Sequence, residues 1–479
     1  MKTSKDCVLP ALIVLLAATV GQAQQTTTIT VQSSQVAADQ VDYSLYINLA
    51  DLGSGFFDKV VDGTDLSVTL GDGTQLDREL VFLDKAAQRG ELYARVPLLS
   101  STANTDININ YGGGAGGNAN SRSTWGPQFS EVWHFEGTDD ATCCFGSTIN
   151  AVEKEGAPGE FNKFVNANDS NPVYDVQSKF GRGVEFPGQD ADLFGDNANT
   201  SNDALYLLAE NASNLNPNLV TVVFWTKIPD GVDHPWNWVY SQRASQGFAG
   251  GTIDLGHSNA NDPDTTPNGT PFWQWIDNNG ARKVGTGQGN ETDDGIWHQL
   301  VGVLDETEAR LYIDGVLFAA GVLNGYEGLD VNNHMISSQG WNDPEFCTGE
   351  PSSISGVVGD PCQNLELRGI VDDFRHLNVI LSQDDITTLF NNQSSPETFY
   401  EVERNGLPGD FDGDDDVDGA DFLLAQQQAD LAAAIAAWQG GYGTGVGAVS
   451  AVDGVPEPSA VVLLLAGLIC LQRRSRTII

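Results

Sequence analysis

The chain has 479 residues, of which 40% are hydrophobic and 18% are charged. Its 65 acidic residues outnumber its 23 basic residues and leave a formal net charge of −42. A surface this acidic repels phosphate groups, which excludes nucleic acid as a partner. The acidic residues are interspersed with apolar ones, so they indicate folded domains with acidic surfaces rather than a disordered acidic tail.

The N-terminus has the order of features found in secretory signals. Lys2 and Lys5 precede an apolar run over residues 8–20, and Gly21-Gln22-Ala23 supplies small residues at the positions that a signal peptidase reads. The run is too short to span a bilayer comfortably. We therefore expect residues 1–23 to be a signal peptide and the mature protein to start near Gln24.

The C-terminus carries a second apolar run over residues 460–471, followed by three arginines at 473, 474 and 476. A helix of this length covers about 18 Å, whereas the hydrocarbon core is about 30 Å thick. With Pro456-Glu457-Pro458 before it, the segment 455–479 resembles the PEP-CTERM sorting signal. The resemblance implies a membrane sorting protease as a partner and delivery to the cell envelope, outer surface or extracellular matrix; the alternative is an ordinary tail anchor.

Four cysteines lie between these two segments, at positions 143, 144, 347 and 362. An exported chain meets an oxidising compartment, where disulfides form. Cys347 and Cys362 bracket a stretch rich in Gly, Ser and Pro, so we expect them to be bonded to each other. Cys143 and Cys144 are adjacent and would bridge each other only with strain. Their pairing stays open, and the absence of a CxxC pair gives no indication of zinc.

Residues 24–111 contain short runs that alternate apolar and polar residues, at 41–47, 66–70, 92–96 and 107–111, with Gly and Asp turns between them. This pattern predicts a small antiparallel β-sandwich. Asp62-Gly63-Thr64-Asp65-Leu66, Arg95-Val96-Pro97 and Tyr111-Gly112-Gly113 resemble a domain of unknown function that often precedes laminin-G-like domains. Residues 112–124, rich in Gly, Asn and Ser, are predicted to be a linker.

Residues 125–395 contain longer strand-like runs at 219–225, 297–304 and 309–313, and Asp314-Gly315 marks a hairpin turn. The stretches 179–186, 220–225, 295–300 with 311–315, and 369–375 resemble the laminin-G-like, concanavalin A-like jelly roll. The predicted fold is therefore all-β. A β-sandwich is followed by a jelly roll, a short helical calcium-loop segment at 405–445 and a hydrophobic C-terminal helix.

The loop from Asp410 to Asp421 places carboxylates at positions 1, 3, 5, 7, 9 and 12. Calcium takes six to eight oxygen ligands, and this spacing wraps them around one ion. The loop resembles the calcium loop of dockerin modules, with Asp415 where glycine is usual and no second acidic loop after it. The expected calcium ligands are Asp410, Asp412, Asp414, Asp416 and Asp421. The alternative is a solvated acidic spacer.

Two pairs of tryptophans alternate along predicted strands: Trp236 with Trp238, and Trp273 with Trp275. Each pair would lie on one face of its strand, where sugar rings could stack. The alternative is packing in the core between two sheets. The sequence does not orient the strands, so both readings stay open.

The chain lacks the E-x-D-x-x-E pattern of concanavalin A-like glucanases, whose paired carboxylates serve as nucleophile and general acid. It also lacks an HExxH motif and a GxSxG elbow. We therefore expect a non-catalytic surface protein that binds an extracellular polysaccharide, a surface glycan or another extracellular partner through its jelly roll. The alternatives are a glycoside hydrolase or lyase with an unrecognised site, and a purely structural matrix protein.

Overall fold

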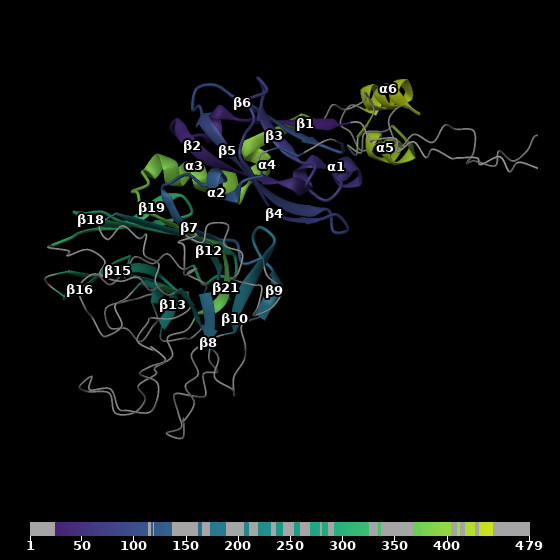
Figure 1. The fold of residues 1–479 in the computed structure, drawn as a ribbon. Helices are drawn as coiled ribbons and strands as arrows, with labels where there is room; N and C mark the ends of the chain where they lie inside the picture. Colours follow the sequence, from purple (N-terminus) through teal and green to yellow (C-terminus); the bar gives the residue numbers. More distant parts are fainter. Residues whose placement is uncertain are drawn as a thin grey trace, which may run out of the picture.

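The computed structural model confirms the all-β fold class: antiparallel sheets dominate and helices are few. It forms an N-terminal module, a jelly-roll unit and a small pair of helices near the C-terminus (Figure 1). The structure describes residues 24–113, 116–117, 119–136, 161–164, 173–187, 206–209, 219–230, 236–242, 253–258, 269–277, 280–285, 292–324, 334–336, 367–403, 410–411, 417–426 and 431–443.

The N-terminal module is a sandwich of two small sheets, with strand orders β22-β1-β6-β3 and β2-β5-β4. Its strands are β1 (Gln25–Val31), β2 (Gln40–Asn48), β3 (Ser67–Leu70), β4 (Arg78–Asp84), β5 (Arg89–Leu99), β6 (Thr105–Tyr111) and β22 (Tyr400–Glu403). Its short helices are η1 (Ser33–Gln35), η2 (Leu49–Leu52) and α1 (Ser54–Lys59). In β1 and β6 the isoleucines Ile29, Ile107 and Ile109 are buried between the sheets, as the alternation predicts.

Strand β22 comes from the far side of the jelly-roll sequence, yet it completes the first module. It pairs antiparallel with β1 in the register Val31↔Tyr400 to Thr28↔Glu403. The hydroxyl of Tyr400 accepts a hydrogen bond from the Asn48 backbone N–H at 2.9 Å and donates one to Asp51 at 2.8 Å. The range 24–111 expected from the sequence is therefore incomplete, and the jelly-roll unit is an insertion within the N-terminal module.

The jelly-roll unit packs two large antiparallel sheets against each other. The eight-stranded sheet has the order β19-β18-β17-β12-β21-β10-β9 with β7 also on β21, and the seven-stranded sheet has the order β16-β15-β14-β13-β20-β11-β8. The strands of the eight-stranded sheet are β7 (Phe129–Trp133), β9 (Val173–Gln177), β10 (Arg182–Pro187), β12 (Val220–Lys227), β17 (Trp297–Leu304), β18 (Glu308–Ile313), β19 (Val316–Val322) and β21 (Arg368–Leu377). Those of the seven-stranded sheet are β8 (Phe161–Phe164), β11 (Tyr206–Ala209), β13 (Trp236–Gln242), β14 (Ile253–Ser258), β15 (Pro271–Asp277), β16 (Gly280–Val284) and β20 (His334–Ile336).

The predicted hairpin at Asp314-Gly315 joins β18 to β19. Both residues have positive φ angles, 49° and 77°, as the tight turn between two paired strands requires. The core between the sheets is rich in aromatic residues, including Phe224, Tyr240 and Phe374. Periodicity and turn chemistry therefore predict this part of the fold correctly.

Helix α3 (Gln383–Ser394) joins the jelly-roll unit to the N-terminal module, followed by α4 (Pro396–Phe399) (Figure 1). Ser382 and Asp385 form a capping box at its start. Near its end the Asn392 side chain binds both backbone groups of Tyr46 in β2, with Oδ1 accepting from the N–H at 2.9 Å and Nδ2 donating to the carbonyl at 3.0 Å. The short helix α2 (Ser121–Thr124) lies in the segment expected as a linker.

The C-terminal helices α5 (Gly419–Ala425) and α6 (Leu431–Gly441) pack against each other through Phe422 and Trp438, whose ring centroids are 4.6 Å apart. The indole N–H of Trp438 donates to the Asp418 carbonyl at 2.6 Å. Of the helices that the structure describes, none is long and apolar enough to cross a membrane. The predicted signal at 1–23 and sorting tail at 455–479 lie outside the described residues.

We predict that Tyr400→Phe destabilises the N-terminal module although it lies beyond the jelly-roll sequence. The substitution leaves the half-buried Asn48 N–H without its acceptor, which costs about 1–3 kcal/mol of unfolding free energy. Urea unfolding followed by tryptophan fluorescence measures this change. Tyr442→Phe, on a side chain that is 54% exposed, is the matched control and should shift stability by no more than about 0.5 kcal/mol. Equal effects of the two substitutions would contradict the role of β22.

Candidate functional site

A β-bulge in β21 builds the junction between the N-terminal module and the eight-stranded sheet. The β12–β21 register shifts between Val223↔Arg375 and Trp225↔Asp372, so β21 holds one extra residue opposite β12. Asp373 has a φ of 49°, the left-handed conformation that an aspartate tolerates better than most residues. Val371 and Phe374 both reach the jelly-roll core. The extra residue therefore lets the consecutive Asp372 and Asp373 both face the N-terminal module.

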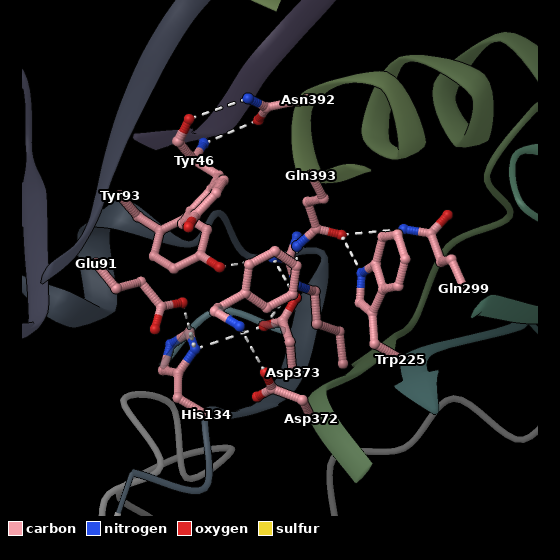
Figure 2. A network of polar contacts seen from close by, with 12 residues as sticks. Tyr46, Glu91, Tyr93, His134, Trp225, Gln299, Asp372, Asp373, Asn392 and Gln393 are labelled. Carbon is pink, nitrogen blue, oxygen red and sulfur yellow. Dashed lines mark hydrogen bonds and ion pairs between the residues drawn. The ribbon is translucent and has the colours of Figure 1, made fainter. Parts of the chain in front are cut away.

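Arg375 is the centre of the charged contacts that fill this junction. Its Nη2 lies 2.7 Å from Asp373 Oδ2 and donates to the Tyr93 hydroxyl at 3.2 Å. The guanidinium group lies over the Trp125 ring at 4.7 Å from the centroid. Gln393, at the end of α3, donates to the same Asp373 carboxylate at 2.5 Å (Figure 2). Arg375 is fully buried, and Asp373 neutralises its charge within the junction.

His134 is the second buried cation and bridges the two units. Its Nδ1 lies 3.5 Å from Asp373 and 3.6 Å from Glu91 (Figure 2). Its Nε2 lies 3.7 Å from Glu79. Glu79 and Glu91 belong to β4 and β5, whereas Asp373 belongs to β21. Burial by itself lowers the pKa of His134, but hydrogen bonding to Asp373 and Glu79 and the charge of Glu91 hold it well above its ordinary value. His134 therefore lies among three acidic side chains that favour its protonated form.

Three other carboxyls of the junction have raised pKa values. Burial raises the pKa of Glu91 and of Asp372 well above the ordinary values, and burial raises the pKa of Glu136 to about 7. Asp373 shows the opposite behaviour: burial raises its pKa, but Arg375 and His134 lower it further, so the net shift is downward. The junction thus combines Asp373, whose pKa is lowered, with three carboxyls whose pKa values are raised. Among the described residues, no group of three or more His, Cys, Asp or Glu side chains is arranged to hold a metal ion.

A pocket of about 370 Å³ opens beside this charged junction, a size that accommodates a small ligand. Residues 39–44 of the N-terminal module form one wall, and residues 379–381 with α3 form the other. Buried Phe129, Leu377 and Leu389 supply apolar surface, and Arg375 also lines the pocket. Because both units contribute walls, the pocket exists only while they are joined.

Three carboxylates surround the pocket, and their partners differ. Asp42 forms an ion pair with Arg95 at 3.0 Å. Asp39 Oδ1 accepts hydrogen bonds from the Ser101 N–H at 2.7 Å and the Ser101 hydroxyl at 2.9 Å, and these bonds lower the pKa of Asp39. Asp385 Oδ2 accepts from the N–H and the hydroxyl of Ser382, both at 2.8 Å. Asp39 and Asp385 are therefore oriented carboxylates without a basic partner in these contacts.

The structure corrects one of the two predicted tryptophan platforms. Trp273 and Trp275 of β15 are 0% and 2% exposed and pack in the core between the sheets. Their ring faces are covered by the opposite sheet, so this pair packs in the core, as the alternative interpretation holds, and offers no surface to a sugar. Trp236 and Trp238 lie on β13 in register with Ser258 and Gly256. Their side chains lie outside what the structure describes, so their role stays a prediction.

A hydrogen-bonded polar row crosses the seven-stranded sheet on the face opposite Trp273 and Trp275. Ser241, Asp254 and Gln274 occupy one register line across β13, β14 and β15. Asp254 accepts from the Ser241 hydroxyl at 2.5 Å and from Gln274 Nε2 at 3.0 Å. All three side chains are buried, so these contacts hold the strands in register rather than present polar groups to a ligand.

Only the two ends of the predicted calcium loop are described. Asp421 is fully buried, and its two oxygens accept from the N–H groups of Phe411 at 2.5 Å and Asp418 at 2.7 Å. Residues 412–416, which include Asp412, Asp414 and Asp416, lie outside the described residues, as do Cys143, Cys144, Cys347 and Cys362. The calcium site and the disulfide therefore stay predictions. The contacts of Asp421 close the loop between Asp410 and the start of α5.

Sequence patterns did not reveal the charged junction. His134 lies in no metal-binding spacing, and Asp372-Asp373-Phe374-Arg375 stands within a stretch that matches the closing strand of a jelly roll. One signal was present: two consecutive acids and an arginine are unusual beside the apolar residues Ile370, Val371 and Phe374 of the same run. Their partners Glu79, Glu91 and Tyr93 come from a different unit, and no local pattern connects them to β21.

Residues 199–387, less than half of the chain, match the model of the concanavalin A-like lectin/glucanases superfamily. The match covers β11 to β21 and part of α3. A comparison with curated proteins gives no match.

Domain 4 of AbnA, a GH43 extracellular arabinanase from Geobacillus stearothermophilus in complex with arabinotriose, is 14% identical with a TM-score of 0.35, over 55% of this chain and 98% of that domain. The binding domain of Paraclostridial Mosquitocidal Protein 1 is 13% identical with a TM-score of 0.34, over 55% and 52% of the two chains. The botulinum neurotoxin serotype D ligand binding domain in complex with N-acetylneuraminic acid is 12% identical with a TM-score of 0.32, over 56% and 51%.

The chain thus spans nearly all of the arabinanase domain and about half of each toxin domain. Likenesses this distant carry no argument about a ligand or an activity. The function has to be argued from the pocket and the residues around it.

The junction predicts a loss of stability as the pH rises. A group whose pKa is higher in the folded protein than in the unfolded chain contributes its full stabilisation below the unfolded pKa. That stabilisation is lost as the pH rises through the folded pKa. Raised pKa values are found for four groups of the junction, His134, Glu91, Asp372 and Glu136. The loss of stability therefore begins above about pH 4, where carboxyls of the unfolded chain ionise. The contribution of Glu136 is lost around pH 7, its pKa in the folded protein. Glu91→Gln cannot ionise and should reduce the fall in thermal stability between pH 5 and pH 9.

The control for this measurement is Glu401→Gln, on an exposed glutamate of β22. It removes the same charge from a surface position and should leave the pH dependence of the melting temperature unchanged. Glu91→Gln and Glu401→Gln curves with the same slope would show that the junction does not govern the pH dependence.

We predict calcium binding by the full chain at Asp410, Asp412, Asp414, Asp416 and Asp421, with a dissociation constant of about 10⁻⁴ to 10⁻³ M. Close carboxylates repel one another, and the cation removes that repulsion. Titration calorimetry should show heat that disappears in the double variant Asp412→Ala, Asp421→Ala. The control Asp58→Ala, on an exposed aspartate of α1, should retain it. Heat that survives in the double variant would leave this loop an acidic spacer.

Proposed function

We propose that this chain is an exported, surface-associated, non-catalytic protein that binds glycans through its jelly-roll unit, at the junction pocket. The pocket is the observation that carries the proposal, because it combines apolar walls with oriented carboxylates. The family match over residues 199–387 supports a carbohydrate ligand, since that superfamily takes its name from lectins and glucanases.

The chemistry of a sugar fits the two kinds of surface in this pocket. A sugar ring has an apolar face of C–H groups, which packs against side chains such as Phe129, Leu377 and Leu389. Its hydroxyls donate hydrogen bonds, and the carboxylate oxygens of Asp39 and Asp385 accept them. Each of these carboxylates is already held in place by serine groups on one oxygen. The site therefore needs little rearrangement to receive a ligand.

Binding rather than hydrolysis is favoured by the placement of the carboxylates. Among the described side chains on the outer face of β13–β15, Asp254 is the one carboxylate. Its oxygens accept hydrogen bonds from Ser241 and Gln274. A glycosidase needs two carboxyl groups on either side of the scissile bond. Asp39 and Asp385 flank the pocket, but their serine partners hold them as acceptors rather than as a general acid.

Export and anchoring complete the proposal. The predicted signal peptide and PEP-CTERM tail send the protein to the cell envelope or the extracellular matrix, where the sorting protease processes the tail. In the sequence, the predicted calcium loop and the α5–α6 pair lie between the jelly-roll unit and the predicted tail. A calcium-stabilised spacer at this place would hold the pocket away from the membrane.

Blocking the pocket tests the proposal. Val41 lines the pocket and is 72% exposed, so Val41→Arg places a long side chain across the opening at little cost in stability. We expect a loss of affinity of at least about tenfold on a glycan panel that includes plant, bacterial and chitin-type oligosaccharides. Val61→Arg is the matched control, because Val61 is 55% exposed in the same module but away from the pocket.

Three outcomes are informative. Loss of binding with Val41→Arg alone supports the pocket. Binding that neither substitution alters places the glycan site elsewhere on the chain. Release of reducing sugar from any oligosaccharide of the panel by the wild-type protein would overturn the non-catalytic assignment and favour a hydrolase.

A further inference from the structure

We infer that the junction pocket selects sugars that carry an amine, accepts neutral sugars more weakly and rejects acidic sugars. This inference rests on the proposed glycan binding and assigns a ligand class to that pocket. The observation behind it is the balance of charges among the groups that line the pocket.

The two cationic groups near the pocket are already neutralised. Arg375, which lines it, is held 2.7 Å from Asp373 and stacks on Trp125. Arg95 forms an ion pair with Asp42, with its Nε at 3.2 Å from Oδ1 and its Nη2 at 3.0 Å from Oδ2. Neither guanidinium group is available to a carboxylate of a uronic or sialic acid. An anionic sugar would therefore enter without a counter-charge from these two arginines, which is costly in a partly buried site.

Asp39 and Asp385 are acidic, and the hydrogen bonds that hold them come from serine groups rather than from a basic side chain. Asp39 is bound by Ser100 and Ser101, and Asp385 is bound by Ser382. Serine groups leave the negative charge of a carboxylate in place. The two carboxylates come from opposite walls, one on the segment before β2 and one on the first turn of α3. A cationic group between them gains attraction from both.

The apolar part of the pocket lining requires that the ligand also has an apolar surface. Phe129, Leu377 and Leu389 give the pocket surface that a simple ammonium ion or a metal ion would leave unfilled. An amino sugar supplies the apolar ring face and the cation in one molecule. The same two features would be offered by a lysine side chain, although its flexible stem loses more entropy on binding than a rigid ring.

A substitution of Asp39 tests this selectivity, because the side chain is exposed and its described hydrogen bonds are all made by Oδ1. Asp39→Asn keeps the shape and acceptor oxygen but removes the charge. Asp72→Asn is the matched control: Asp72 is also an exposed aspartate of this module with its pKa lowered by hydrogen bonds, here from Thr74, and it lies outside the pocket.

The experiment measures binding of glucosamine, glucose and glucuronic acid, and of chitosan, cellulose and polyuronate fragments, to the full-length protein at low and high salt. We expect the order amine, neutral, acid at low salt, with the amine preference reduced by salt because the Debye length shortens. Asp39→Asn should reduce the ratio of amine to neutral affinity by about threefold or more, as loss of one charge pair in a partly screened site predicts. Asp72→Asn should leave the ratio unchanged.

The possible failures are distinguishable. If the wild-type protein binds sugars but Val41→Arg and Asp39→Asn have no effect, glycan binding stands and the pocket assignment falls. If an acidic sugar binds as tightly as glucosamine, the selectivity falls while the pocket stands. If Nα-acetyl-lysine amide competes as well as glucosamine, the ring is not recognised and the sugar class is wrong. If no sugar binds, the proposed function itself falls.

Discussion

The ion pair between Arg375 and Asp373 is the interaction on which the rest of the structure depends. It lies on β21 where the N-terminal module, the end of β7 and α3 meet, and these three parts supply its partners Tyr93, His134 and Gln393. A buried ion pair of this kind contributes little net stability, because desolvation offsets most of the attraction. What it provides is geometry, since each group has one position that satisfies its neighbours. The left-handed φ of Asp373 and the bulge in β21 are the local strain that this geometry requires.

The insertion of the jelly roll into the N-terminal module has the same consequence at a larger scale. The chain crosses the junction once before β7 and again through α3 and α4, and it ends by adding β22 to the first sandwich. Three features restrict rotation of the two units relative to each other. The chain passes twice between them, β22 pairs with β1, and Asn392 forms two hydrogen bonds with the backbone of Tyr46. Because the pocket has walls from both units, its shape is as fixed as the junction. A binding site that is rigid before the ligand arrives loses less entropy on binding.

Charge connects the junction to the acidic character of the whole chain. The chain has a net charge of −42, and burial raises the pKa values of Glu91 and Asp372 in the junction. The junction places the buried cations His134 and Arg375 beside Asp373. At the pocket, the contacts that hold Asp39 and Asp385 come from serine groups and include no cation. The difference between interior and rim is what gives the pocket its proposed preference for an amine over an acid.

The sequence by itself determined the elements whose signal is local. Alternating apolar residues predicted the strands, Asp314-Gly315 predicted the hairpin, and the jelly-roll resemblance agreed with a fold of two large sheets. Tertiary structure alone decided that Trp273 and Trp275 face the core, because a period of two gives a strand two faces and does not say which one is covered. It alone decided that β22 completes a sandwich begun by β1, and that Glu79, Glu91, His134 and Asp373 share one site. Those residues are distant along the chain, and the contacts between them arise only from the way the two units pack, which no run of neighbouring residues encodes.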